Sequence, residues 1–374
     1  MILCDWFLPG YLAGGPIRSI ETLTQQLGKD LNFRIITTDR DFRSDKAYTQ
    51  VPANTWTVFE GREVFYVSPD HMNPDFMLEL ISNTPHDVLY LNSLFSKLFT
   101  VYPLRWKRQG KLGSQVVLAP RGMLGDGALA IKPLKKKLFL LFSRAFGLFK
   151  DVCWQSTSAQ ETAEIRKRIG QQARIMEVSN LPKAAAIAKP IEKEPGSLKL
   201  CFISRISEKK NLNFALEVLK SINSIPIQFD VYGPVEDQAY WELCSATAKL
   251  LPATVTFGYR NSLKPEEIGR ALENYHALFL PTQNENYGHI IVEALQHARP
   301  VVLSDQTPWR GLREEGVGFD IPLSDKQTFT EAIAALAALD QVRFDAMSIS
   351  CRAYISKKLN TEKIKEHYLC LFNA

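Results

Sequence analysis

The chain has 374 residues, of which 45% are hydrophobic and 23% are charged. This length predicts two or three domains of about 150 residues and excludes a single small module, while the composition excludes an intrinsically disordered or fibrous protein. The net charge of +5 is too small for a dedicated nucleic-acid-binding protein, but it suits anionic ligands or membrane surfaces.

Six cysteines are scattered through apolar stretches, and no two of them form a Cys-x-x-Cys pair. We expect reduced, buried thiols and therefore a cytoplasmic protein. The N-terminus lacks the basic segment of a secretory signal peptide. The longest apolar stretch, 138–149, is interrupted by Ser143, Arg144 and Gly147 and is too short for a spanning helix, so we expect no transmembrane segment.

In the first half of the chain, short runs of β-branched and aromatic residues alternate with longer helical stretches. This alternation predicts a parallel sheet that is covered by helices on both faces. The expected strands are 2–4, 33–38, 63–68, 88–92, 115–119, 152–157 and 175–178.

The same alternation recurs after a stretch rich in Pro, Ala and Lys. We expect a first domain at 1–181, a linker at 182–197, a second doubly wound domain at 198–355, and a terminal helix at 356–374 that crosses back to the first domain. The expected strands are 199–204, 228–232, 254–257, 277–280, 301–304 and 319–321. Open α/β sheets bind ligands at the carboxyl ends of their strands, which predicts a ligand cleft between the two domains.

A glycine-containing loop, 9–16, follows the first expected strand and precedes a helix. Gly14 and Gly15 could let backbone N–H groups approach a phosphate, or they could simply form a tight turn. The loop is neither a Gly-x-Gly-x-x-Gly fingerprint nor a Walker loop, which argues against nicotinamide and ATP chemistry.

Two polar loops of the second domain are candidates for anion binding. Arg205, Lys209 and Lys210 follow the first strand of that domain, where clustered cations suit a diphosphate; the alternative is a solvated basic loop. Glu285 precedes a helix that we expect to begin near Gly288, whose first amides can meet an anion. Glu293 lies in that helix among apolar neighbours, so it either binds ligand hydroxyls or faces solvent.

Two further patterns each allow two interpretations. Asp39 and Asp41 form an Asp-x-Asp pattern that can hold a metal, but we favour a solvated loop and expect no metal site. Residues 132–150 combine aromatic side chains with the cations Lys135, Lys136, Lys137 and Arg144. This helix could lie on an anionic bilayer or pack on its own sheet with the lysines exposed. Nucleophile-elbow, Cys–His and zinc motifs are absent, which argues against a simple hydrolase.

Taken together, these motifs resemble the retaining glycosyltransferases of family 4, which have the GT-B fold. Further phrases that carry the resemblance are Ala119–Leu124, Trp154–Ser158 with Glu161, Val231–Pro234, and Pro300–Asp305 with Thr307–Trp309. The phrases look most like bacterial enzymes that build lipopolysaccharide, capsule or exopolysaccharide.

The resemblance implies a nucleoside-diphosphate sugar donor, such as a UDP- or GDP-sugar, a glycan or lipid-linked glycan acceptor, and no metal or other cofactor. Arg205, Lys210 and Glu285 would be catalytic, with the two cations on the diphosphate and Glu285 on the sugar hydroxyls. Glu293 would bind the ribose. The donor-binding residues are Gly14, Gly15, Arg205, Lys210, Glu285, Asn286, Tyr287, Gly288, His289, Ile290 and Glu293.

The resemblance departs from the family at one point on the acceptor side. Many relatives have a His after the strand that corresponds to 115–119, whereas this chain has Arg121 there. Arg121, Asn92 and Ser93 are therefore candidate acceptor-side residues. The alternatives are a nucleotide-sugar epimerase, or a catalytically silent nucleotide-sugar-binding partner in a polysaccharide assembly complex.

Overall fold

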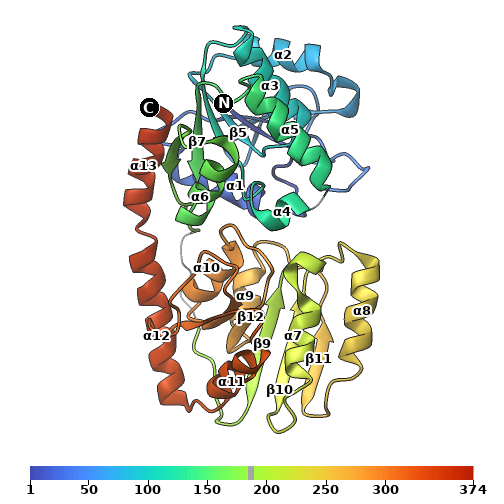
Figure 1. The fold of residues 1–374 in the computed structure, drawn as a ribbon, viewed down its shortest axis with the longest axis vertical. Helices are drawn as coiled ribbons and strands as arrows, with labels where there is room; N and C mark the ends of the chain where they lie inside the picture. Colours follow the sequence, from blue (N-terminus) through green and yellow to red (C-terminus); the bar gives the residue numbers. More distant parts are fainter. Residues whose placement is uncertain (131, 184–188, 374) are drawn as a thin grey trace. The chain divides into compact units, whose positions relative to one another are not determined.

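The computed structural model describes residues 1–130, 132–183 and 189–373, and it divides the chain into two compact units. The first unit comprises Met1–Leu181 with Thr361–Ala374, and the second comprises Pro182–Asn360 (Figure 1). The chain thus returns to its first unit for the last helix. The expected linker and second-domain boundaries differ from this division, because the second unit begins at Pro182 and extends to Asn360.

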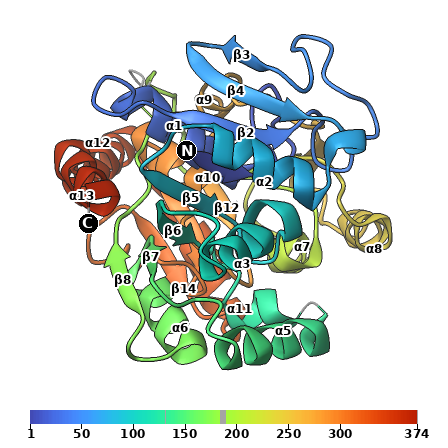
Figure 2. The same cartoon turned by 90° about the horizontal axis from the view of Figure 1, so that it is seen from above.

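In the described part of the first unit, eight strands form one sheet in the order β3-β4-β2-β1-β5-β6-β7-β8 (Figure 2). Neighbours are parallel except β3 and β4. The strands are β1 (Ile2–Cys4), β2 (Arg34–Thr38), β3 (Trp56–Phe59), β4 (Arg62–Val67), β5 (Val88–Asn92), β6 (Gln115–Ala119), β7 (Val152–Ser156) and β8 (Arg174–Glu177).

The edge strand β3 was not expected from the sequence. It pairs with β4 through a two-residue turn at Glu60 and Gly61, whose φ angles are 47° and 75°. Two consecutive positive φ angles are typical of a turn that matches the twist of a hairpin. The β3–β4 pair therefore adds an antiparallel edge to a sheet that is otherwise parallel.

The helices of the first unit cover this sheet and bury its apolar strands. They are α1 (Gly15–Leu27), α2 (Pro74–Asn83), α3 (Tyr102–Arg108), α4 (Asp126–Ala130), α5 (Pro133–Ala145), α6 (Ala159–Ile169) and α13 (Thr361–Asn373). All three residues of β1 and all five of β7 are buried. Burial on both faces explains why β1 reads as a continuous apolar run rather than as an alternating one.

The second unit contains a wholly parallel sheet, with the described strands in the order β11-β10-β9-β12-β13-β14. They are β9 (Leu198–Ile203), β10 (Ile227–Tyr232), β11 (Val255–Tyr259), β12 (Ala277–Leu280), β13 (Val301–Ser304) and β14 (Gly318–Ile321). Successive strands move outward in both directions from the β9–β12 pair. Such a reversal of strand order creates a place for a ligand at the carboxyl ends of β9 and β12.

The helices of the second unit lie on the two faces of this sheet. They are α7 (Leu212–Leu219), α8 (Gln238–Ala248), α9 (Ile268–Leu272), α10 (His289–Gln296), α11 (Lys326–Ala337) and α12 (Gln341–Lys358). Helix α7 packs against α8 and α11, whereas α10 packs against α9 and α12. Right-handed crossovers in opposite directions place these two groups of helices on opposite faces.

Residues 189–197, which we expected in a linker, pack onto the second unit. The buried Lys193 ammonium donates to the carbonyls of Ala337 at 2.9 Å and Leu339 at 3.1 Å. His276 accepts the Lys199 N–H at Nδ1, and its Nε2 contacts the Glu192 carbonyl, both at 2.9 Å. Burial lowers the pKa of His276 to about 4, so the ring is neutral at pH 7 and can accept at one nitrogen while donating at the other.

Candidate functional site

Hydrogen bonds join two loops of the second unit at the carboxyl ends of the neighbouring strands β9 and β12. The Gln283 N–H donates to the Lys209 carbonyl at 2.8 Å, and the Thr282 hydroxyl donates to the same carbonyl at 3.0 Å. The Asn211 side-chain amide donates to the Pro281 carbonyl at 3.0 Å. These bonds hold the loop that precedes α10 against the loop that precedes α7.

The joined loops bring Lys210 and Glu285 together as an ion pair. Their side chains are 12% and 16% exposed, so the pair is largely shielded from bulk water. Burial alone would raise the pKa of Glu285, but the charge and hydrogen bond of Lys210 outweigh it, and the pKa of Glu285 lies below its ordinary value. Glu285 is therefore an anion at neutral pH.

Arg205 lies in the loop between β9 and α7. It pairs with Glu236, which was not a candidate from the sequence. Its Nη1 is 3.2 Å from Oε2 of Glu236. The two residues meet because the chains after β9 and β10 remain paired: Ile206 forms an isolated bridge with Val235, and the Glu236 N–H donates to the Ile206 carbonyl at 3.0 Å.

Gly233 makes this close pairing possible. A Cβ atom at Gly233 would lie 1.9 Å from the Ser204 carbonyl oxygen, and the φ of Gly233 is 140°. A side chain at this position would force the two loops apart. A glycine directly after β10 is the sequence signal that could have indicated the approach of the Arg205 loop to the Glu236 loop.

Helix α10 begins with amides directed toward the same edge of the sheet. Its N-cap, Gly288, has a φ of 78° and no side-chain cap hydrogen bond. The preceding Tyr287 is buried, and its carbonyl accepts from the Trp309 indole N–H at 2.6 Å. We therefore assign Tyr287 a positioning role in the loop, while Asn286, His289 and Ile290 are half-buried around the start of the helix.

Glu293 lies one turn further along α10 and is also half-buried. Its neighbours Ile291, Val292, Ala294 and Leu295 are buried. The structure thus places Arg205, Lys210, Glu285 and the start of α10 on loops at one edge of the second sheet, with Glu293 on the helix that follows.

In the first unit, Asp41 holds the glycine-containing loop that precedes α1. Its carboxylate accepts the N–H of Tyr11 at 2.9 Å, of Leu12 at 3.1 Å and of Phe42 at 2.7 Å. Gly14 is the N-cap of α1, with a φ of 72°. Asp41 thus fixes the loop that presents Gly14 and Gly15, a role that the sequence analysis did not assign to it.

Replacing Asp41 with alanine should destabilise the first unit by about 1–3 kcal/mol, because three backbone N–H groups lose their acceptor. Urea unfolding of the variant measures this loss. Asp30→Ala, at an exposed position, is the matched control. A loss no larger than that of the control would show that Asp41 does not hold the loop.

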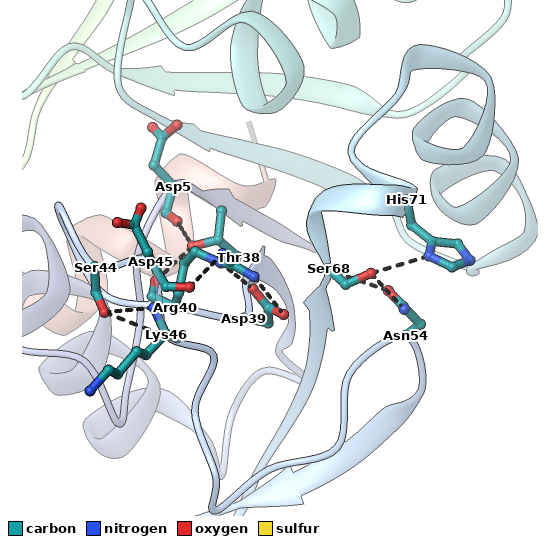
Figure 3. A network of polar contacts seen from close by, with 10 residues as sticks. All are labelled: Asp5, Thr38, Asp39, Arg40, Ser44, Asp45, Lys46, Asn54, Ser68 and His71. Atoms are coloured by element: carbon teal, nitrogen blue, oxygen red, sulfur yellow. Dashed lines mark hydrogen bonds and ion pairs between the residues drawn. The ribbon is translucent and has the colours of Figure 1, made fainter.

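Asp39, the other acid of the Asp-x-Asp pattern, binds its neighbour Arg40 rather than solvent. The Arg40 Nε lies 2.8 Å from Oδ1 of Asp39, and Asp39 is buried (Figure 3). The expected solvated loop was therefore wrong: Asp39 is in an ion pair and Asp41 is bound by backbone N–H groups. Among the described residues, no three His, Cys, Asp or Glu side chains group in a way that could hold a metal.

Two acceptor-side candidates contact each other: Asn92 is the last residue of β5, and Arg121 follows β6. The side-chain oxygen Oδ1 of Asn92 accepts from Nε of Arg121 at 3.1 Å and from Nη2 at 2.7 Å. Nη1 donates to Asn180 at 2.7 Å, and Nη2 also donates to the Tyr90 hydroxyl at 2.9 Å. Neutral oxygens thus orient the guanidinium. Ser93, which is buried, donates from Oγ to Sδ of Met123 at 3.6 Å.

A chain of hydrogen bonds extends this cluster to the C-terminal helix. The Tyr90 hydroxyl donates to Gln155, whose side-chain amide donates to the Tyr368 hydroxyl of α13 at 2.9 Å. The Phe372 ring also packs 5.2 Å from the Tyr90 ring. Helix α13 therefore completes the packing beneath Arg121, which explains why it groups with the first unit.

Asp5 is a candidate that the sequence analysis passed over. It directly follows β1, and its carboxylate accepts from the Ser96 hydroxyl at 2.7 Å. Burial raises the pKa of Asp5, and the Ser96 hydrogen bond offsets this effect only in part. In Figure 3 the carboxylate points away from Asp39 and Arg40. An acid at the carboxyl end of the first strand is the signal that could have identified it.

Comparison with known proteins finds a family model that matches most of the second unit. Residues 184–347 match the model of the family described as glycosyl transferases group 1. The second unit is therefore similar to a group 1 glycosyltransferase domain. All the second-unit candidates, from Arg205 to Glu293, lie within the matched residues.

Solved structures support the same architecture for both units. Sucrose-phosphate synthase from Thermosynechococcus elongatus is 14% identical, with a TM-score of 0.75 over 100% of this chain and 97% of that one. HepE from Anabaena, solved with UDP and glucose, is 14% identical, with a TM-score of 0.72 over 100% and 99% of the two chains. WaaG, described as a glycosyltransferase of lipopolysaccharide biosynthesis, is 14% identical, with a TM-score of 0.64 over 98% and 97%. No curated protein matches the sequence.

These similarities confirm the predicted fold class: the chain has the GT-B fold, with one Rossmann-like sheet in the group 1 domain and another in the first unit. Among the described residues, no helix is both long and apolar enough to cross a membrane.

The expected membrane patch, outside the group 1 domain, lies on α5 of the first unit. Lys135, Lys137 and Arg144 are exposed there. Lys136 is not part of this exposed group, because its ammonium donates to the Ala128 carbonyl at 2.6 Å and lies 5.1 Å from the centre of the Phe95 ring. Of the four cations of the expected patch, Lys135, Lys137 and Arg144 are therefore exposed, whereas Lys136 is held against the first unit.

Proposed function

We propose that this chain is a retaining glycosyltransferase that moves a sugar from a nucleoside-diphosphate sugar to a glycan or lipid-linked glycan. The observation that carries the proposal is the grouping of Arg205, Lys210 and Glu285 at the carboxyl ends of strands in a group 1 glycosyltransferase domain. UDP-sugars are the first donors to test, because the similar HepE structure holds UDP and glucose. GDP-sugars are the second.

Arg205 and Lys210 would stabilise the departing diphosphate. The bond between the anomeric carbon and the diphosphate oxygen breaks, and its electron pair leaves with the diphosphate. Lys210 has three N–H donors and uses one on Glu285, while Arg205 contacts Glu236 through one of its nitrogens. Their remaining donors, together with the first amides of α10, can bind phosphate oxygens. Fixed donors of this kind stabilise charge that develops in the transition state.

Glu285 would bind the sugar hydroxyls, and Glu293 would bind those of the ribose. Ionised Glu285 is an acceptor only, so it selects groups that donate hydrogen bonds. The acceptor oxygen forms its bond to the anomeric carbon on the face that the diphosphate leaves, and its proton passes to a departing phosphate oxygen. The products are a nucleoside diphosphate and the glycosylated acceptor, with no metal in the proposed route.

The first unit would supply the acceptor-binding groups. Arg121, Asn92 and Asp5 lie at the carboxyl ends of β6, β5 and β1, the edge at which such sheets bind ligands. We propose a role in bacterial surface polysaccharide synthesis, in line with the lipopolysaccharide role stated for WaaG. The six unpaired cysteines favour a reducing compartment, and we therefore place this activity in the cytoplasm, at the inner face of the membrane.

A donor-turnover assay tests the proposal. The purified chain is incubated separately with UDP-glucose, UDP-N-acetylglucosamine and GDP-mannose, with and without a bacterial glycolipid extract. Released nucleoside diphosphate is quantified, and the sugar product is analysed by NMR. We expect one donor to release its nucleoside diphosphate faster with extract, and the new anomeric centre to keep the donor configuration.

Other results would overturn the proposal in recognisable ways. A sugar that is isomerised while still attached to its nucleotide would identify an epimerase. Binding of a donor without any turnover, with or without extract, would identify a silent binding partner. Inversion at the anomeric centre would refute retention while preserving sugar transfer.

A further inference from the structure

We infer that the outer face of α5 inserts, parallel to the surface, into a bilayer that contains anionic lipids. The apolar residues of this face are Leu134, Leu138, Leu141, Phe142 and Phe146, at the end of the helix. Leu134, Leu141 and Phe146 are 70%, 62% and 73% exposed. Large apolar side chains are scattered singly on ordinary surfaces, whereas here they follow one another along one helix.

The positions of these residues show that they form one stripe. Leu134, Leu138, Leu141 and Phe142 are separated by four, three and one residues, the spacing of a single helical face. The opposite face already packs on the unit, because Leu140 and Ser143 are buried. The inner face of the helix therefore packs on the first unit. The outer apolar stripe is not needed for that packing and remains exposed.

Packing on the inner side anchors the helix firmly. The Phe139 ring lies 5.5 Å from Phe95 and 6.4 Å from Phe149, which in turn lies 5.1 Å from Trp154 of β7. In the first unit, α5 packs against α4 and α6, and it lies beside α6 (Figure 2). The outer stripe is thus presented by a rigid part of the fold rather than by a loose segment.

Cations flank the stripe on both sides. At 100° per residue, Lys135 lies on one side of the apolar face and Lys137 and Arg144 on the other. Residues 132–150 contain no Asp or Glu. In the part of the chain that the structure describes, no carboxylate pairs with Lys135 or Lys137. The flanks therefore remain positive and available to anionic groups.

This combination favours a bilayer over another protein surface. An apolar layer bordered by negative headgroups matches an apolar stripe bordered by cations. A symmetric pair of chains meeting at α5 would instead bring like-charged flanks together. The helix has 13 residues, about 20 Å at 1.5 Å per residue, so it cannot span a hydrocarbon core of about 30 Å and lies along the surface.

Vesicle flotation tests the inference without any assay of sugar transfer, so its outcome is independent of the proposed function. The full chain is mixed with vesicles of phosphatidylcholine alone, or with 30% phosphatidylglycerol, at low and high salt. We expect binding to the anionic vesicles only, weakened by salt. The variant Leu141→Ser with Phe146→Ser should bind at least about tenfold more weakly, as should Lys135→Gln with Lys137→Gln and Arg144→Gln.

Matched controls come from exposed residues of the second unit. Leu243→Ser with Leu250→Ser removes two exposed apolar side chains, and Lys249→Gln with Lys264→Gln removes two exposed charges. These controls should bind like wild type. Wild-type binding by the α5 variants, or no binding by the wild type, would overturn the inference. So would a dimer of the wild type in sedimentation that Leu141→Ser with Phe146→Ser converts to a monomer.

Discussion

Replacing Arg205 with alanine is expected to lower kcat for sugar transfer by about a hundredfold or more while the protein stays folded. In the structure Arg205 forms an ion pair with Glu236, and the Arg205 side chain is 36% exposed. It supports no buried core, so its loss should affect the departing diphosphate rather than folding. Initial rates with saturating donor measure kcat, and far-ultraviolet circular dichroism checks the fold.

Two further variants sharpen this prediction. Arg205→Lys keeps the charge but loses the planar fork, so its kcat should lie between those of wild type and Arg205→Ala. Arg270→Ala removes an exposed arginine of α9 and should leave kcat unchanged. A folded Arg205→Ala variant with a wild-type rate would show that Arg205 does not stabilise the leaving group.

Replacing Glu285 with glutamine should reduce kcat/KM by about a hundredfold, because the sugar hydroxyls lose an anionic acceptor and Lys210 loses its partner. The fold should persist, since the loops that carry the pair are also joined by the bonds of Gln283, Thr282 and Asn211. Glu266→Gln, at an exposed site, is the control. A Glu285→Gln variant that fails to fold would instead indicate a structural role.

The pH dependence of unfolding provides an independent readout for the pair. The pKa of Glu285 is lower in the folded chain than its ordinary value of 4.5, so the unfolded chain binds more protons in acid. The stability that the ionised pair contributes is therefore complete above pH 4.5 and is lost as the pH falls through the folded value. The difference in unfolding free energy between wild type and Glu285→Gln should shrink over that range. A constant difference would contradict the ion pair.

Most strands could be predicted from the sequence because they are short apolar runs between polar turns. The expected strands 88–92, 115–119 and 277–280 match β5, β6 and β12 at both ends. Strand β3 was not predicted because its turn is Glu60-Gly61, which is not one of the Asn-Gly or Asp-Gly pairs that most clearly indicate a hairpin.

The site was only partly readable from the sequence. Arg205, Lys210 and Glu285 stand out as charged residues after predicted strands, but their partners depend on the order of strands in the sheet. Lys210 and Glu285 are 75 positions apart, and they meet because β9 and β12 are neighbours. Glu236 follows β10, on the other side of β9, and had no distinguishing motif.

The same limit applies to α5. Its amphipathic composition was evident, but helical spacing alone does not say which side faces the unit. The inward contacts of Lys136 and Phe139 settle the orientation, and the contact of Lys136 excludes it from the membrane patch that was expected from the sequence.

Thermal stabilisation by nucleotides tests the central claim, that the second unit binds a nucleoside-diphosphate sugar through Arg205 and Lys210, most directly. UDP, GDP, ADP and NAD are compared without added metal on wild type, Arg205→Ala and Arg270→Ala. We predict that UDP or GDP raises Tm in wild type and Arg270→Ala, and that this rise is lost in Arg205→Ala. Stabilisation by NAD alone, or an equal rise in Arg205→Ala, would contradict the account.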